Sequence, residues 1–281
     1  MRIVVTGYAS MDYAVRLDSP AAPDRTATIL SRPREWPRLG GSPAYVAAAL
    51  AAGGLRGVTP VSWIGEDAQG VRYREELRLR GVETEGLRFR PGRTPVCILA
   101  YQPDGGCLCL YDPGLDPPPG LDDGQRALIR QADLICLTVG PTEATREALA
   151  LASPDAKVVW AVKADPRATP PDLAAALAAR ADFIVHSRGE AEFVAAAGAT
   201  RRDAVRIETR GPEGVAIFHD GEETRVAVEP IATDDATGAG DAWLGGFLAA
   251  HCVRGETAIA SARSGSVSVA ELFALRRPSR T

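Results

Sequence analysis

Two kinds of segment alternate along the chain: short runs of β-branched and other apolar residues, and longer runs rich in alanine and leucine. The short runs predict strands at 2–6, 58–64, 133–138, 157–162, 182–186, 204–209 and 214–219. The longer runs predict helices at 42–53, 68–80, 122–131, 142–152, 170–180, 188–197 and 239–252. This alternation is typical of βαβ units, so we expect a mostly parallel central sheet with helices on both faces.

Two stretches break the alternation. Residues 12–39 are proline-rich and read as extended segments, and residues 93–112 alternate around an Asp-Gly-Gly turn at 104–106, which predicts a β-hairpin. Both fit poorly inside a doubly wound sheet, so we expect them to form a small β lid beside the main body. The alternative for the hairpin is an antiparallel extension at one edge of the main sheet.

Composition limits the classes of function. The chain has 281 residues, 46% of them hydrophobic and 24% charged, which suits a globular protein with a sizeable core. A net charge of −4 without a block of basic residues argues against a nucleic-acid partner. There is no apolar run long enough for a membrane span and no leader pattern before the first strand, so we expect a cytoplasmic protein with no membrane partner. Cys107 and Cys109 are expected to be buried, reduced thiols.

The stretch Asp235–Trp243 carries the strongest chemical signal. Small residues, Gly238, Ala239 and Gly240, stand where a loop turns into a helix, and Asp241 follows them. Backbone amides at a helix N-terminus lack intrahelical partners and bind anions, and glycine lets an anion approach closely. A carboxylate beside such a site suits phosphoryl transfer, because it can take the proton of an attacking hydroxyl. The plainer alternative is an ordinary capped helix.

The string DATGAGDAW, residues 235–243, closely resembles the C-terminal signature of the ribokinase/PfkB family of carbohydrate and nucleoside kinases, with Ala236 as its one departure. The resemblance implies a ribokinase-like fold, ATP as phosphoryl donor and Mg²⁺. It also implies that Asp241 is the catalytic base and that the amides of Gly238, Ala239 and Gly240 form the anion hole. A monovalent cation held by backbone near Asp235 and a C-terminal loop is a further implied feature.

The acceptor side of the site is predicted from two N-terminal motifs. Ser10 and Asp12 follow the first strand, at the sheet edge where open α/β proteins bind ligands. Gly40, Gly41, a serine and a proline then start a helix. In the family this region binds substrate, and Asp12 matches the carboxylate that holds its hydroxyls. Tyr45 replaces the family's asparagine, so it either contacts substrate or belongs to the core.

The nucleotide side is predicted from two later loops. Ser187 and Glu190 match the family's NxxE motif with serine in place of asparagine, and Glu190 is then the residue that holds Mg²⁺ through water. The alternative for this pair is a helix capping box. Thr209, Gly211 and Gly214 resemble the family's TxGxxG nucleotide loop, for which a plain β-turn is the alternative.

These motifs occur in the family's order, so residues 1–281 are interpreted as a single ribokinase-like kinase domain with lid segments at about 12–39 and 93–112. The predicted activity is transfer of the ATP γ-phosphate to a hydroxyl of a sugar, sugar acid or nucleoside. The alternatives are an adenosine-type nucleoside kinase and a non-catalytic sugar- or nucleotide-binding regulator. The pocket segments show no lysine or arginine cluster, which disfavours phosphosugars, although Arg16, Arg32 or Arg93 on the lid could overturn this. The family also implies a homodimer formed through the lid.

Overall fold

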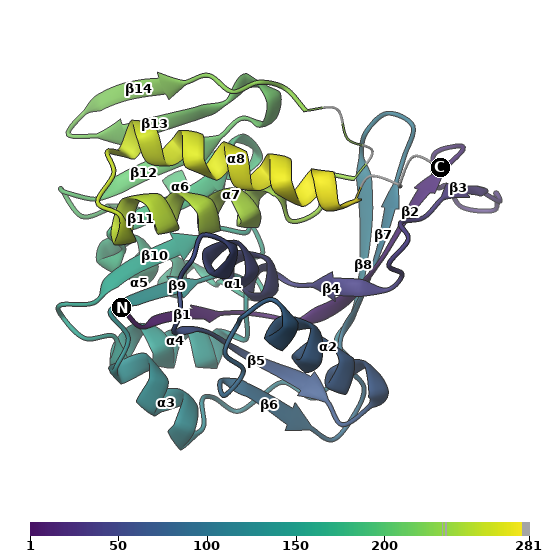
Figure 1. Cartoon of the computed structure of the whole chain (residues 1–281), viewed down its shortest axis with the longest axis horizontal. Coiled ribbons are helices and arrows are strands. Elements are labelled where there is room, and N and C mark those ends of the chain that lie inside the picture. Colours follow the sequence, from purple (N-terminus) through teal and green to yellow (C-terminus); the bar gives the residue numbers. More distant parts are fainter. Residues whose placement is uncertain (232, 234, 277–281) are drawn as a thin grey trace.

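The computed structural model describes residues 1–231, 233 and 235–276 of the chain. A nine-stranded sheet runs through its main body in the order β14-β13-β12-β11-β10-β9-β1-β5-β6 (Figure 1). Its strands are β1 (Ile3–Thr6), β5 (Val58–Gly65), β6 (Leu87–Arg90), β9 (Leu134–Leu137), β10 (Lys157–Ala161), β11 (Phe183–Ser187), β12 (Val205–Thr209), β13 (Val215–His219) and β14 (Glu222–Val226). Only the pairings of β13 with β12 and β14 are antiparallel within this sheet. The parallel strands therefore share one C-terminal edge.

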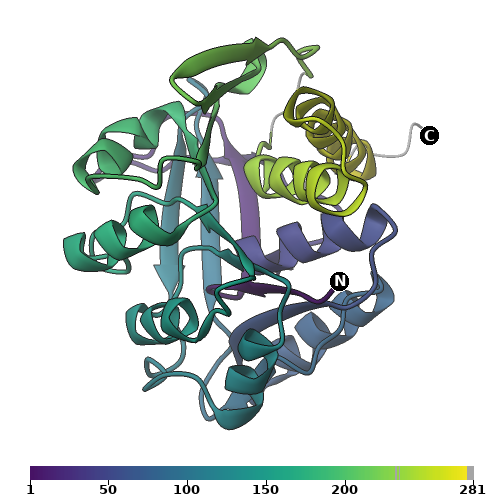
Figure 2. The ribbon, with the colours of Figure 1, turned by 90° about the vertical axis from the view of Figure 1, so that its left-hand side faces the viewer.

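Helices cover both faces of this sheet (Figure 2). The helices are α1 (Ser42–Ala52), α2 (Ala68–Leu79), α3 (Asp123–Arg130), α4 (Thr142–Leu151), α5 (Pro171–Arg180), α6 (Ala191–Ala196), α7 (Ala239–Leu248) and α8 (Ala258–Arg276). Neighbouring residues of β1 point to opposite faces, as a strand requires. Ile3 belongs to the core under α1, α2, α7 and α8, and Val4 belongs to the core under α3 to α6. The predicted three-layer α/β/α architecture is confirmed.

Helices α1 and α7 pack unusually closely, because their contact is made of small residues. A Cβ placed on Gly245 would come within 2.5 Å of the Ala49 methyl and 2.8 Å of the Val46 carbonyl. A glycine here therefore allows an approach that alanine would prevent. The close packing brings the N-termini of α1 and α7, which carry the two glycine motifs of the sequence, to the same place.

A second, five-stranded sheet stands beside the C-terminal edge of the large one and forms the lid (Figure 1). It contains β2 (Ser10–Leu17), β3 (Ile29–Ser31), β4 (Arg38–Gly40), β7 (Val96–Tyr101) and β8 (Cys107–Asp112). The hairpin β7–β8 turns at residues 104–106 and pairs with β2, not with the edge of the main sheet. The lid prediction is confirmed, and the edge-extension alternative is wrong.

Some elements depart from the predictions. Helix α8 and strands β6 and β14 were not predicted, because serine, glycine and charged residues interrupt their apolar pattern. Helix α7 continues into a π-helical turn, Ala249–Val253, so the predicted long helix is confirmed with a change of winding. The expected burial of Cys107 and Cys109 is wrong: both thiols are exposed, because β8 is the edge strand of the lid.

Candidate active site

Asp241 lies in the first turn of α7, at the C-terminal edge of the large sheet. Gly238 caps this helix with left-handed backbone angles, φ 71° and ψ 5°, which glycine adopts without strain. The amide of Ala239 donates to the carbonyl of Ala236 at 3.1 Å, closing the turn before the helix. The amides of Gly240 and Asp241 follow as first-turn donors at the positive end of the helix dipole. Of the predicted anion-site amides, that of Ala239 is therefore engaged within the turn, and that of Gly240 stands in the first turn of the helix.

The surroundings of Asp241 change its acidity. Burial raises the pKa of its carboxyl to about 6, and the nearby Glu190 carboxylate acts in the same direction. A hydrogen bond with Ser42 and the positive charge of Lys163 lower the pKa and partly oppose the rise. A carboxyl with this pKa is mostly ionised at neutral pH yet is a much better proton acceptor than an exposed aspartate.

The predicted acceptor residues come together on the lid side. Strand β2 pairs with β4 so that Ser10 lies opposite Gly40 and Asp12 opposite Arg38. The hydroxyl of Ser10 donates to Asp12 Oδ1 at 2.7 Å. Gly40 has to be glycine here, since a Cβ on it would lie 1.9 Å from the same oxygen. Burial raises the pKa of Asp12 to about 6, and the Ser10 hydrogen bond and the charge of Arg38 oppose the rise.

Two further predicted residues, Gly41 and Tyr45, join the acceptor side to the anion site. Gly41 has a φ of 81°, and a Cβ on it would lie 2.2 Å from the carbonyl of Tyr8. The Tyr45 hydroxyl lies 3.5 Å from Asp12 Oδ2, and its ring packs against Gly238. Tyr45 therefore lies between Asp12 and the α7 N-terminus rather than in either of the two large cores.

Two arginines that the motifs did not reveal lie in the same place. Arg38 is only 6% exposed, and its Nη1 lies 2.5 Å from a carboxylate oxygen of Asp235. Arg276, in the last described turn of α8, donates to the hydroxyl of Tyr45 at 3.3 Å, and its guanidinium carbon lies 5.6 Å from the ring centroid. The expectation that the pocket lacks basic side chains is wrong. It failed because the pairing of β4 with β2 brings Arg38 beside Asp12, and because Arg276 arrives from a distant helix.

The nucleotide-side residues lie on two adjacent loops at the ends of β11 and β12. The amide and hydroxyl of Ser187 both donate to Glu190 Oε2 at 2.8 Å, so the capping box is formed. Thr209 donates to the His186 carbonyl at 3.4 Å. Gly211 and Gly214 adopt φ values of 56° and 93°, which the turn into β13 requires. The Glu190 carboxylate also helps to raise the pKa of Asp241, so its charge acts on the first turn of α7.

Lys163 is a further residue that sequence reasoning missed. It follows β10 at the C-terminal edge of the sheet, is exposed, and acts electrostatically on Asp241 and Cys107. Lys157 and Lys163 are the two lysines of an arginine-rich chain, which is the signal that could have drawn attention to it. It thus places a positive charge near one residue of the α7 N-terminus and one residue of the lid.

The lid contacts the body directly above this region. The hydroxyls of Tyr101 on β7 and Thr237 share a hydrogen bond, and the rings of Tyr8 and Tyr111 lie 5.7 Å apart. The described residues contain no cluster of three or more histidine, cysteine, aspartate or glutamate side chains that could hold a metal ion. Within the same described part of the chain, no helix combines the length and apolar character needed to cross a membrane.

The family model for pfkB carbohydrate kinases matches residues 1–272, which include every motif described above. The chain belongs to this family. Its activity is ATP-dependent transfer of a phosphoryl group to an alcohol group of a sugar-like acceptor.

Several known proteins resemble this kinase over most of its length. It is 30% identical over 268 residues to an ATP-dependent ribose-1-phosphate kinase of Halopiger xanaduensis, covering 91% of this chain and 86% of that protein. A Cryptococcus neoformans ribokinase, solved in complex with ADP, superposes with a TM-score of 0.78 at 19% identity, covering 95% of this chain and 92% of that one. An adenosine kinase from Sinorhizobium meliloti gives 0.79 at 18% identity, with coverages of 99% and 96%. These two structures establish the shared fold.

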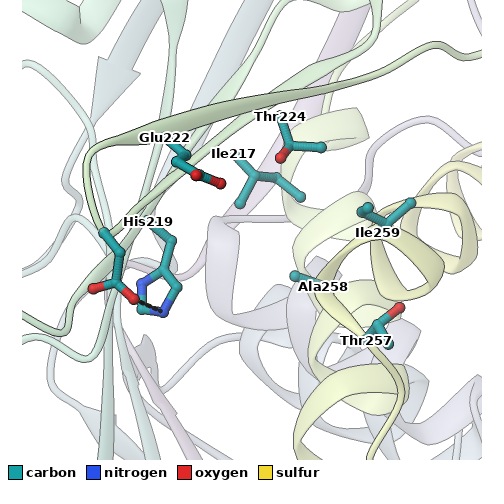
Figure 3. A pocket seen from close by; sticks show the side chains of 8 residues that line it. Ile217, His219, Glu222, Thr224, Thr257, Ala258 and Ile259 are labelled. Atoms are coloured by element: carbon teal, nitrogen blue, oxygen red, sulfur yellow. Dashed lines mark ion pairs between the residues drawn. The ribbon is translucent and has the colours of Figure 1, made fainter.

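One hollow of the kinase lies away from its active site. It measures about 290 Å³ and is bordered by the β13–β14 hairpin and the start of α8, including Ile217, His219 and Thr257 (Figure 3). Strand β13 runs antiparallel from Gly214 toward His219, so the hollow lies at the opposite edge of the sheet from the anion site. It therefore contributes nothing to the geometry around Asp241.

Proposed function

We propose that this kinase phosphorylates a hydroxyl of a sugar-like acceptor that also carries an anionic group, such as a phosphate, and that Arg38 binds that group. The observation that carries the proposal is the state of Arg38. Among the described residues, its Nε and Nη2 are buried without a hydrogen-bond acceptor, and its Nη1 has one partner, the carboxylate of Asp235 at 2.5 Å. A guanidinium has five donors, and buried donors without acceptors are costly.

The surroundings of Arg38 favour an acceptor as the missing partner. Arg38 on β4 is the cross-strand partner of Asp12 on β2. The carboxylate of Asp12 suits adjacent hydroxyls, so one small molecule that carries a hydroxyl and an anionic group could contact both side chains. The Halopiger relative is named for an acceptor of this kind, ribose-1-phosphate. Together these support a sugar phosphate more than a neutral sugar or nucleoside.

In the proposed reaction, Asp241 takes the proton of the acceptor hydroxyl as the hydroxyl oxygen attacks the γ-phosphorus of ATP. The bond from that phosphorus to the bridging oxygen breaks, and ADP leaves with the electron pair. The amides of Gly238 and Gly240 donate to the oxygens of the transferring group, where negative charge must be held. The predicted third donor, the amide of Ala239, is engaged by the carbonyl of Ala236. The lid, held to the body through Tyr101 and Thr237, excludes the water that would otherwise compete as acceptor.

We assign the ATP side to Ser187, Thr209, Gly211 and Gly214. Magnesium bound with ATP supplies charge neutralisation of the phosphates, and Glu190 would hold it through water. The residues fit this role, because the capping box engages Glu190 Oε2 and leaves Oε1 outside it, and because the Glu190 charge acts on Asp241. Magnesium usually keeps several waters and few protein ligands, which agrees with a single carboxylate.

The lid also supports the proposed homodimer. Ile98 and Leu110 are cross-strand partners on β7 and β8, and they are 44% and 53% exposed; Leu108, on the same face, is 41% exposed. Asp12 pairs with Cys97, so this apolar face is the one turned away from the acceptor residues. Light scattering of the purified chain tests the dimer, and an Ile98→Lys, Leu110→Lys variant should be monomeric.

A matched acceptor panel tests the proposed function. Sugar phosphates, the corresponding neutral sugars, and nucleosides are each supplied with ATP, and product is detected by mass spectrometry. We expect the highest kcat/KM with a sugar phosphate. A variant carrying Arg38→Met and Asp235→Asn removes both charges of the buried pair, and its preference for the phosphorylated acceptor should fall at least about tenfold. A wild-type preference for neutral sugars or nucleosides would contradict the proposal.

A further inference from the structure

Three oxygens of the loop that precedes α7 lie around the side chain of Arg276. Arg276 Nη1 donates to the carbonyl of Thr237 at 2.7 Å and to that of Asp235 at 3.3 Å. The same nitrogen lies 3.6 Å from Asp235 Oδ1. The residues that supply these oxygens directly precede Gly238, so the contacts of Arg276 fix the backbone from which the first amides of α7 are presented.

Arg276 is well placed to be rigid. Its side chain is 14% exposed, and its second terminal nitrogen donates to the Tyr45 hydroxyl while the guanidinium faces the Tyr45 ring. Tyr45 in turn packs against Gly238. One guanidinium thus holds the anion loop both through its carbonyls and through the ring that covers it.

This arrangement disagrees with the monovalent-cation site that the family implies near Asp235. A bare cation would need the same oxygens, because carbonyl and carboxylate groups are the ligands that hard cations take. Here Arg276 engages the two carbonyls, and Arg38 lies 2.5 Å from the other carboxylate oxygen of Asp235. A third positive charge beside two guanidinium groups would be strongly repelled. The residues present do not fit the cation.

We infer that Arg276 takes the place of the monovalent cation: it is a positioning residue that orders the anion loop, and ATP binding and turnover are independent of potassium. The inference rests on the proposed role of the Gly238–Gly240 amides but not on which acceptor is used. For that reason the main test uses ATP binding without acceptor, and a failure of the acceptor proposal leaves it intact.

The first test uses the unaltered protein. ATP affinity is measured by calorimetry with Mg²⁺ in potassium, sodium and choline chloride at equal ionic strength. We expect the same Kd in all three salts, and the same kcat once an acceptor is found. A Kd at least about tenfold lower in potassium than in choline would overturn the inference.

The second test uses Arg276→Ala. It should weaken ATP binding about ten- to a hundredfold, and potassium or millimolar methylguanidinium should restore most of the loss because the freed oxygens accept a cation again. Arg276→Lys should retain more affinity than Arg276→Ala. The matched control, Arg263→Ala, removes an exposed arginine from the same helix and should match wild type. Wild-type affinity in Arg276→Ala, or a loss that neither cation restores in a protein that still unfolds cooperatively, would contradict the inference.

Discussion

The ring of Tyr45 lies so close to Gly238 that a Cβ placed on Gly238 would come within 2.7 Å of the ring carbons. This contact joins the acceptor motif of α1 to the anion loop of α7. It also explains why glycine is needed at residue 238 for two separate reasons, since the φ of 71° already disfavours any other residue.

Gly238→Ala should therefore remove most kinase activity. The left-handed conformation costs about 1–2 kcal/mol for a residue with a Cβ, and the new methyl must also displace Tyr45 from its place beside Asp12. Gly255→Ala is the matched control, because Gly255 has a φ of 70° and open space around it. We expect both variants to lose stability in thermal unfolding, and only Gly238→Ala to lose kcat. Equal activities in the two variants would show that the Tyr45 contact has no part in the site.

Gly240→Ala is expected to keep or raise the stability of the protein and to impair its use of ATP. A Cβ on Gly240 meets nothing within 4 Å, and an alanine in place of glycine stabilises a helix by about 0.4–1 kcal/mol. If the anion binds over this amide, the methyl occupies the ligand's space. The melting temperature should stay the same or rise while the KM for ATP rises. Unchanged ATP kinetics would show that the phosphate does not bind over the Gly240 amide.

Asp241→Asn should lower kcat about 10²- to 10⁴-fold, the usual contribution of a general base. The same substitution should not lower the free energy of unfolding at pH 8. Burial raises the folded pKa of Asp241 to about 6, above its ordinary value of 3.8, so the ionised carboxylate is unfavourable in the folded state. The stability advantage of the variant should shrink as the pH falls from 8 to 5, where wild-type Asp241 becomes protonated. Unfolding curves of both proteins at pH 8 and pH 5 measure this change in the stability difference.

Activity should fall in acid as two carboxyls gain protons. Asp241 and Asp12 both have a pKa raised by burial to about 6, and both act as carboxylates in the proposed reaction. The logarithm of kcat/KM should therefore decline below pH 6 with a slope between about one and two. In Asp12→Asn the slope should fall to about one, after correction for titration of ATP and acceptor. A profile that is flat down to pH 5 would argue against Asp241 as the base.

The alternation of apolar strands and alanine-rich helices was enough to predict the sheet, its two helical layers and most element positions. The reason is that strand and helix periodicities are local and are written into consecutive residues. The glycine motifs around residues 40 and 238 could be found for a similar reason: backbone that must approach a ligand or take a positive φ requires glycine in the chain itself. Asp241, Ser10 and Asp12 were then predicted as site residues from their place beside these motifs.

The charge balance of the pocket was decided only by the tertiary structure. Arg38 lies near Asp12 because β4 pairs with β2, and Arg276 reaches Asp235 because α8 folds back along α7 over a distance of 41 residues in sequence. The sequence showed no basic cluster in the pocket segments, and it left the contribution of lid arginines open. Coulombic contacts depend on distance in space, and that distance is set by strand pairing and helix packing rather than by spacing along the chain.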